Sequence, residues 1–332
     1  MVCRQSRTLD RPGRLAVSTP ASSFWAKRRI VITGGHGFVG QHVVQRLIDT
    51  RGVSSDAISI PRSSDRDLRV LADAREVIEG HDIVLHLAAD AGGLGYSSRC
   101  SAQQYYNCSA IDLQVLEAAR RSGAARVVCI SSSTAYPRNA PSPLEENMLF
   151  GELPRESHVG YGLAKRNLVA LASIYHQQYG MNVATIVSSN AYGPGDAIDA
   201  TTSHVIPATI LKCLNDPELV VWGDGSPVRD FFYVEDLAQA ILLAAESLPA
   251  SEYVNVGSGR EVTIRELTDT IARLTAFAGP IRYDTTKPGG EQRRTVSIEK
   301  ARRVIGFEPA FSLEDGLRRT IDWMKHVAVP NS

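Results

Sequence analysis

The chain has 332 residues, and its 36 lysines and arginines balance 36 aspartates and glutamates. This balance excludes the strongly basic surface of a nucleic-acid-binding protein, so we expect no nucleic-acid partner. The five cysteines lack C-x-x-C spacing, so the sequence predicts neither a disulfide framework nor a metal site. No apolar stretch approaches the length of a membrane span, and we expect a soluble, cytoplasmic protein without a membrane partner.

Residues 1–28 are rich in serine and arginine, and Asp10 is their only acidic residue. They lack the apolar centre of a secretion signal. A transit peptide has a similar composition, but a disordered extension accounts for it more simply. We therefore expect the folded protein to begin near residue 29.

From residue 29 onward, short apolar runs alternate with helical patterns, which is typical of a parallel sheet covered by helices on both faces. The predicted elements are, in order, strand 30–33, helix 37–49, strand 57–61, strand 83–88, helix 103–122, strand 126–131, helix 160–179 and strand 182–187. The pattern predicts an α/β fold with a Rossmann-type, doubly wound parallel sheet, whose NAD(P)-binding domain spans residues 29–190.

Beyond residue 190 the pattern is mixed. The predicted elements are helix 204–215, strand 219–222, helix 234–247, strand 253–256 and helix 263–276. We expect a smaller, mixed α/β C-terminal lobe over residues 191–332 that mainly binds substrate. Some of its segments should return to the main sheet, so the boundary is approximate.

The first predicted strand runs into a glycine-rich turn, Thr33-Gly34-Gly35-His36-Gly37-Phe38-Val39-Gly40, which opens the first helix. Glycines at this spacing let a pyrophosphate approach backbone N–H groups at the helix N-terminus. Because the turn opens a long alternating series, a cofactor role is favoured over a merely tight turn. The predicted cofactor residues here are Gly34, Gly37, Phe38, Val39 and Gly40.

The second predicted strand ends in Pro61-Arg62-Ser63-Ser64, without the acidic residue that usually binds an unmodified ribose. Arg62 suits a 2′-phosphate, so NADP(H) is favoured; NAD(H) stays possible if Arg62 is an ordinary solvated residue. Further cofactor contacts are predicted for Asp67, Leu68, Leu87, Ala88, Ala89 and Asn107. The small residues also suit plain packing, and Asn107 also suits an exposed helix position.

Tyr161 and Lys165 are four residues apart in a predicted helix and therefore share one face. A lysine cation there favours the phenolate, so we expect the tyrosine pKa to fall below its ordinary value of about 10. The pair predicts proton transfer beside a dinucleotide. A surface pair is the simpler but less favoured alternative.

Five motifs, in this order, resemble the extended short-chain dehydrogenase/reductases that act on nucleotide sugars. They are the turn 33–40, His86-Leu87-Ala88-Ala89, Ser131-Ser132-Ser133, Tyr161-x-x-x-Lys165 and Asn190-Ala191-Tyr192-Gly193-Pro194. Within this family, the GDP-L-fucose synthases are similar at Ala91-Gly92-Gly93-Leu94, Ser203 to Ala208, Val221-Trp222-Gly223, Pro227-Val228-Arg229 and Lys287-Pro288. The resemblance implies NADPH-dependent reduction at C4 of a GDP-4-keto-6-deoxyhexose after epimerisation at C3 and C5.

By this resemblance, Tyr161 exchanges a proton with the C4 oxygen, Ser132 hydrogen-bonds that oxygen, and Lys165 holds the cofactor ribose. His204 corresponds to the general acid of epimerisation, although a packed histidine at a helix start is an alternative. The implied substrate contacts are Asn190, Val205, Trp222, Arg229 and Lys287. Arg229 and Lys287 are candidates for the diphosphate, and Trp222 for the base.

Thr134 departs from the fucose synthases, which resemble this chain closely but carry a cysteine two residues before the position of Tyr136. Threonine has no accessible basic form near pH 7, so it cannot remove a carbon-bound proton. We therefore expect C4 reduction with doubtful C3/C5 epimerisation. An NDP-sugar epimerase with tightly bound NAD is the alternative, and a non-catalytic dinucleotide-binding scaffold is less favoured. The resemblance also implies a homodimer through helices 103–122 and 160–179.

Overall fold

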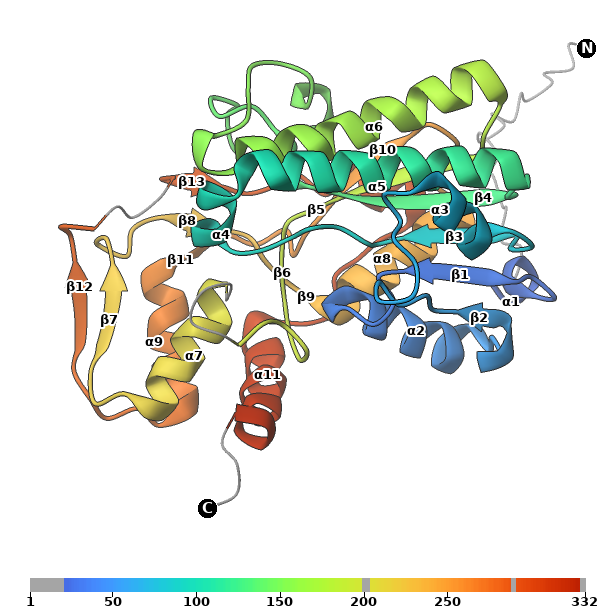
Figure 1. Ribbon diagram of the computed structural model, residues 1–332. Coiled ribbons are helices and arrows are strands. Elements are labelled where there is room, and N and C mark those ends of the chain that lie inside the picture. The colour runs from blue at the N-terminus through green and yellow to red at the C-terminus, as the bar shows by residue number, and fades with distance from the viewer. Residues whose placement is uncertain (1–20, 199–203, 288–290, 329–332) are drawn as a thin grey trace, which may run out of the picture.

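The computed structural model describes residues 21–198, 204–287 and 291–328 (Figure 1). Its centre is a six-stranded parallel sheet with the order β10-β5-β4-β3-β1-β2. The strands are β1 (Ile30–Thr33), β2 (Ile58–Ser59), β3 (Ile83–His86), β4 (Arg126–Ser132), β5 (Val183–Ser188) and β10 (Tyr253–Val256). The predicted Rossmann-type α/β fold is confirmed.

The order of the strands creates a crevice at one edge of the sheet. The chain runs from β1 outward to β2 and then crosses back to β3 on the other side of β1. Ligands of open α/β sheets bind at such a switch point, beyond the carboxyl ends of the strands. Thr33 and His86 are paired in register, so the loops after β1 and β3 begin side by side.

Helices cover both faces of this sheet (Figure 1). One layer contains α2 (Phe38–Arg51) and α8 (Val234–Ser247), and the other contains α3 (Leu71–Ile78), α5 (Ser101–Ser122) and α6 (Val159–Tyr179). In β1, Ile30 and Ile32 join the first core and Val31 joins the second. Burial on both faces explains why the central strands are continuous apolar runs.

Residues 21–28 differ from the expectation of a disordered leader. Residues 1–20 lie outside the described residues, but Ala21–Trp25 form the short helix α1. Trp25 is only 2% exposed, and its indole N–H donates a hydrogen bond to Glu246 at 2.6 Å. A disordered leader extending to residue 28 is therefore wrong for residues 21–28, because the tryptophan anchors them on the core.

The C-terminal lobe has its own apolar core, formed mainly by α7 (Val205–Asn215), α9 (Ile264–Thr275) and α11 (Leu313–Ala328). The parallel pair β7 (Leu219–Trp222) and β12 (Ile281–Asp284) lies at its outer edge (Figure 1). The short strands β6 (Asn190–Tyr192), β8 (Val228–Arg229), β9 (Phe231–Tyr233), β11 (Val262–Thr263) and β13 (Arg293–Arg294) connect this lobe to the sheet.

Parts of the C-terminal half return to the main sheet, as expected: α8 and β10 do so, together with α10 (Glu299–Ile305). The second strand is shorter than predicted, since Pro61 has no N–H to donate to a ladder. The sequence analysis did not predict the helices α3, α4 (Leu94–Arg99), α10 and α11. Within the described ranges, no helix has the length and apolar character needed to cross a membrane.

Candidate functional site

A cavity of about 1510 Å³ opens at the switch point and extends between the sheet and the C-terminal lobe. Its walls come from the loops after β1, β3 and β4, from the start of α6, and from α7, β7 and β8. It therefore has the size and position of a site for a dinucleotide and a second ligand together.

The glycine turn forms the floor of this cavity at the start of α2. Gly34 has φ of +71°, and a Cβ there would lie 2.8 Å from the backbone nitrogen of Ala88, so the two loops approach too closely for a side chain. Gly37 caps α2 without a side chain, which leaves the first N–H groups of the helix available to an anion. The predicted residues Gly34, Gly37, Phe38, Val39 and Gly40 all line the cavity.

Arginines gather at the far end of the cavity, after β2. Arg62, which was predicted to contact the cofactor, lines the cavity, and so do Arg66 and Arg69, which the sequence analysis missed. Arg69 forms an ion pair with Asp67 at 2.8 Å and lowers the pKa of that carboxyl through the hydrogen bonds it donates. This end of the cavity is therefore lined by three guanidinium groups, and the charge of Arg69 is balanced by Asp67.

Leu68, Leu87, Ala88 and Ala89 line the cavity, as does Asn107 from α5. Asn107 accepts a hydrogen bond from Arg69 at 2.9 Å and donates one to Asp90 at 2.8 Å. It is therefore part of a polar network that crosses the cavity wall, rather than an ordinary exposed helix residue.

Tyr161 lies in the first turn of α6 and lines the cavity beside Ser132 and Thr134. Gly162 allows this position, because a Cβ there would lie 2.5 Å from the Thr134 carbonyl oxygen. The start of α6 thus packs directly against the turn after β4. The predicted tyrosine and serine are brought together.

Lys165 is buried behind this wall, with 1% of its surface exposed, and is not among the residues that line the cavity. Its ammonium lies 3.7 Å from Asp112 of α5, and the same carboxylate oxygen lies 2.9 Å from His86 Nε2. His86 Nδ1 is in turn 2.7 Å from the Thr33 hydroxyl. The sequence analysis missed this buried chain, because its members come from four separate elements.

The pKa values of the pair differ from the expectation. Burial raises the pKa of Tyr161, and the opposing effect of Lys165 is smaller, so the expected lowering is wrong. Burial also opposes the charge on Lys165, but Asp112 and then Tyr161 outweigh it and raise the lysine pKa. The pair therefore holds both of its protons at neutral pH.

Ser132 and Thr134 form a hydroxyl pair at the end of β4. The Thr134 hydroxyl donates to the Ser132 oxygen at 2.9 Å, and the Thr134 N–H donates to the same oxygen at 3.2 Å. A hydroxyl has two acceptor lone pairs and one proton. Since both lone pairs are used, the Ser132 proton is left to bind an oxygen in the cavity.

Of the residues predicted to contact the substrate, Asn190, Val205, Trp222 and Arg229 line the cavity. Trp222 is 58% exposed, so its ring is open to a ligand. Arg229 donates hydrogen bonds to two backbone carbonyls, those of Val228 at 2.8 Å and Glu291 at 2.7 Å. Lys287 is exposed beyond the end of β12 and does not line the cavity, and the neighbouring residues 288–290 lie outside the described residues.

His204 precedes α7 and also lines the cavity. Its Nδ1 is 3.2 Å from the buried carboxylate of Asp196, which raises the pKa of the histidine. Its 49% exposed side chain is available to a ligand.

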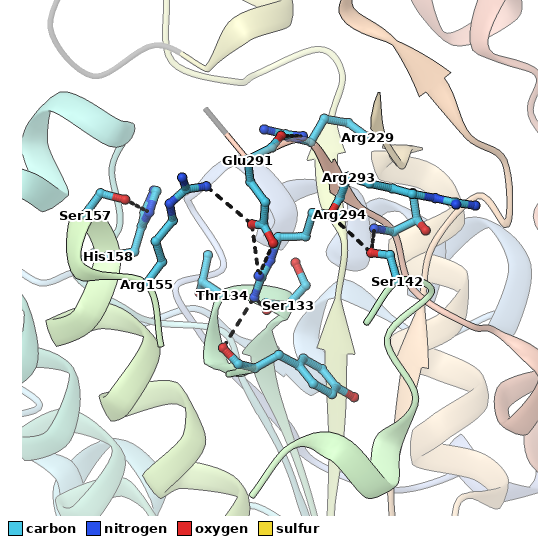
Figure 2. Close-up of polar contacts among 12 residues, drawn as sticks. Ser133, Thr134, Ser142, Arg155, Ser157, His158, Arg229, Glu291, Arg293 and Arg294 are labelled. Atoms are coloured by element: carbon cyan, nitrogen blue, oxygen red, sulfur yellow. Dashed lines mark hydrogen bonds and ion pairs between the residues drawn. The ribbon is translucent and has the colours of Figure 1, made fainter. Parts of the chain in front are cut away.

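A polar cluster around Glu291, missed from the sequence, lies against the turn after β4 (Figure 2). Glu291 forms ion pairs with Arg294 at 3.1 Å and with Arg155 at 3.6 Å. Arg294 also donates a hydrogen bond at 2.6 Å to the carbonyl of Ser133, directly after Ser132. Beside the cluster is His158, which lines the cavity three residues before Tyr161.

A glycine turn at a switch point, with a tyrosine beside a serine hydroxyl and a buried lysine one turn behind, defines a dinucleotide-dependent enzyme. The family model described as the NAD dependent epimerase/dehydratase family matches residues 30–257. The chain belongs to this family.

Its curated relatives include several GDP-L-fucose synthases. A probable GDP-L-fucose synthase of Oryza sativa subsp. japonica is 31% identical over 319 residues, which cover 94% of this chain and 97% of the rice protein. The GDP-L-fucose synthase of Escherichia coli K12 is 31% identical over 317 residues, 90% of this chain and 97% of that protein. The predicted relationship to the GDP-L-fucose synthases is confirmed.

Solved structures share the fold. A UDP-glucose 4-epimerase from Thermotoga maritima, solved with UDP-glucose, matches with a TM-score of 0.79 and 25% identity over 90% of this chain and 99% of the other. A GDP-L-fucose synthetase from Naegleria fowleri bound to NADP matches with a TM-score of 0.82 and 24% identity over 90% and 92%. Both structures therefore share the fold of this chain.

Proposed function

We propose that the protein is an NADP(H)-dependent oxidoreductase that reduces the C4 ketone of a 4-keto-6-deoxyhexose carried on a nucleoside diphosphate, with GDP favoured. The observation that carries this proposal is the hydroxyl pair beside Tyr161. Because Thr134 occupies both lone pairs of Ser132, the serine presents a proton to a ketone oxygen. Such a donor polarises a carbonyl for hydride addition.

The residues present fit a dinucleotide. The close approach at Gly34 and the uncapped start of α2 make a cradle for a pyrophosphate. Arg62, Arg66 and Arg69 favour a 2′-phosphate, and the curated relatives include GDP-L-fucose synthases. When bound, NADPH supplies the hydride that reduces C4.

The side chains then carry out the proton chemistry. Ser132 holds the ketone oxygen, and Tyr161 donates its phenolic proton to that oxygen as negative charge develops on it. The raised pKa of Tyr161 keeps this proton in place before reaction, which suits reduction. Lys165 remains positively charged through Asp112 and stabilises the phenolate that is left.

The C-terminal lobe provides groups suited to the nucleoside diphosphate. Trp222 offers an exposed ring for the base, and Arg229 offers a guanidinium held by two carbonyls. Asn190, whose amide donates to the Asp230 carbonyl at 3.1 Å, and Val205 line the same wall. GDP is preferred because the curated relatives described above are GDP-sugar enzymes.

The test is to mix the protein with NADPH or NADH and a panel of NDP-4-keto-6-deoxyhexoses, following absorbance at the nicotinamide band and product NMR. We expect NADPH to be consumed with the GDP-linked ketone and a 4-hydroxy sugar to appear. The Tyr161→Phe variant should retain NADPH binding and lose about 10²–10⁴-fold in rate. Isomerisation without net NADPH use would instead indicate an epimerase with tightly bound dinucleotide.

We also propose that two copies associate through α5 and α6, which lie side by side on one face of the molecule (Figure 1). These helices expose Tyr106 (66%), Leu113 (46%) and Ile174 (52%), more apolar surface than two solvated helices require. Light scattering should give the mass of a dimer, and the Leu113→Glu variant should give that of a monomer. A monomeric parent protein would contradict the proposal.

A further inference from the structure

We infer that His158 is the base that removes a carbon-bound proton next to the C4 ketone, with His204 as the acid that returns one. This inference rests on the proposed function and deepens it. Both histidines line the cavity that contains Ser132, Thr134 and Tyr161. The site thereby regains an epimerising step that Thr134 itself cannot perform.

Thr134 is unsuitable as the base because its hydroxyl proton is already donated to Ser132 and its oxygen has no basic form near neutrality. In the described part of the chain, six side chains with a carboxylate or an imidazole line the cavity: His36, Asp67, Asp90, His158, Asp196 and His204. His36 belongs to the glycine turn. The other five can be compared by the hydrogen bonds and ion pairs that their carboxylates or ring nitrogens already make.

The three aspartates have committed carboxylates. Asp67 pairs with Arg69, Asp90 accepts from both Asn107 and Tyr96, and Asp196 is bound to His204. Each of these carboxylates is therefore already engaged by a partner. His158, by contrast, has a hydrogen-bond partner at one ring nitrogen only, among the residues that the structure describes.

The position of His158 is fixed by its surroundings. It ends a short 3-10 turn, Glu156–His158, and directly precedes the helix that carries Tyr161. Its Nδ1 lies 3.0 Å from the Ser157 hydroxyl (Figure 2). If Nδ1–H donates to that oxygen, the lone pair remains on Nε2, which is the tautomer that a base requires.

The turn is also tied to the rest of the fold. The N–H of Gly160 donates to the Ser101 hydroxyl at 3.1 Å, and a side chain at Gly160 would collide with the Ser101 carbonyl. The Ser98 hydroxyl donates to the Ser157 carbonyl at 3.4 Å. The turn that carries His158 is thus held by α4 and α5 as well as by α6, which follows it, and this is the preorganisation that proton transfer needs.

The surroundings of the two histidines shift their pKa values in opposite directions. Burial lowers the pKa of His158, and Arg294, Arg155 and His204 lower it further, so its imidazole is neutral near pH 7. Asp196 raises the pKa of His204, which favours its protonated form. A neutral and a protonated imidazole in one cavity are the pair that a two-sided proton transfer requires.

The step is balanced without a co-reactant. The C–H bond beside the ketone breaks, its proton passes to His158, and the electron pair moves into an enolate whose oxygen is held by Ser132 and Tyr161. His204 then delivers a proton to the other face of the same carbon. The histidines return to their starting states by exchanging one proton with water, so the net reaction is inversion at C3 or C5.

The experiment uses the full chain with GDP-4-keto-6-deoxymannose in deuterated water and without NADPH, so exchange is measured apart from reduction. We expect deuterium at C3 or C5 by NMR, and the His158→Gln variant should lose at least about 10²-fold in exchange rate. The matched control is His176→Gln in α6, the helix that follows His158; the Nδ1 of His176 contacts the Met181 carbonyl away from the cavity. That control should exchange at the parent rate.

Two further measurements distinguish a misfolded variant, a wrong role for His158 and a wrong reductase proposal from one another. Fluorescence titration with NADPH checks that His158→Gln is folded, and NADPH oxidation tests the proposed reduction independently. NADPH oxidation by the parent protein with no deuterium incorporation would overturn the role of His158 and leave the reductase intact. Exchange by His158→Gln at the parent rate would overturn it as well, whereas exchange without NADPH oxidation would contradict only the reductase.

Discussion

The ammonium of Lys165 lies 3.7 Å from the Asp112 carboxylate in a region where both side chains are almost fully buried. A buried ion pair gains its Coulomb energy at a large desolvation cost, so removing one partner is more harmful than never having the pair. Asp112 also contacts His86, which extends the charged chain toward the glycine turn. Lys165, the proposed partner of Tyr161, is therefore held in place from α5.

We expect Asp112→Asn to destabilise the protein by about 3–5 kcal/mol, because it leaves the Lys165 charge buried without its partner. The lysine pKa should fall, and the alkaline limb of the pH–rate profile should move to lower pH. Urea unfolding and the profile measure the two effects. Asp49→Asn on the exposed end of α2 is the control and should change neither. An unchanged alkaline limb would mean that Asp112 does not maintain the charge of Lys165.

Replacing Thr134 by valine keeps its shape and removes the hydroxyl that orients Ser132. We expect kcat for ketone reduction to fall by roughly 10-fold, since one hydrogen bond contributes about 0.5–1.5 kcal/mol. Thr134→Ser keeps the hydroxyl and should remain near the parent value. Steady-state kinetics with saturating NADPH make the comparison. Equal losses in the two variants would show that packing, rather than the hydroxyl, matters there.

The arginines at the far end of the cavity predict discrimination between cofactors. Arg62→Ala should raise the Kd for NADPH by about 10–100-fold, because hydrogen bonds to charged groups contribute about 1.5–3 kcal/mol. The Kd for NADH should stay within about twofold. Fluorescence titrations with both cofactors test this, and Arg75→Ala on the exposed side of α3 is the control. A parallel loss for NADH would remove the argument for a 2′-phosphate contact.

The buried carboxyl of Asp230 predicts a pH dependence of stability. Burial raises its pKa to about 6, against the hydrogen bonds from Ser258, so the folded state binds a proton more tightly than the unfolded chain. Its contribution is fully present below about pH 4 and is lost as the pH rises to about 6. Asp230→Asn should therefore raise Tm at pH 8 and have little effect at pH 4. A larger gain at pH 4 would contradict the raised pKa.

Local sequence signals were sufficient for most of the sheet and the helices around it. The strand 30–33 and the helix 234–247 were predicted with their observed bounds, because the first is a short apolar run and the second a strongly apolar helix. The proline at position 61 shortened β2 despite an apolar run. Trp25 anchors a leader that looks disordered in composition, because the partner that orders it, Glu246, lies 221 residues away.

The site was predicted where family motifs mark it and missed where only the fold assembles it. Ser132 and Tyr161 are both in such motifs and meet in the cavity. Asp112 and Arg69 carry no local signal, since their importance depends on contacts with distant residues. His158 had one usable signal, its position one turn before the catalytic tyrosine. Lys287, which a motif assigned to the diphosphate, does not line the cavity, and its role stays a prediction.

The hydrogen bond from Arg294 to the Ser133 carbonyl joins a strand of the C-terminal lobe to the turn after β4, next to Ser132. Arg294 also pairs with Glu291, whose carbonyl binds Arg229. A change in sugar preference that displaces this strand would therefore also displace the catalytic turn. During evolution of the family, substrate choice and chemical competence at this junction would have to change together, through substitutions that compensate for one another.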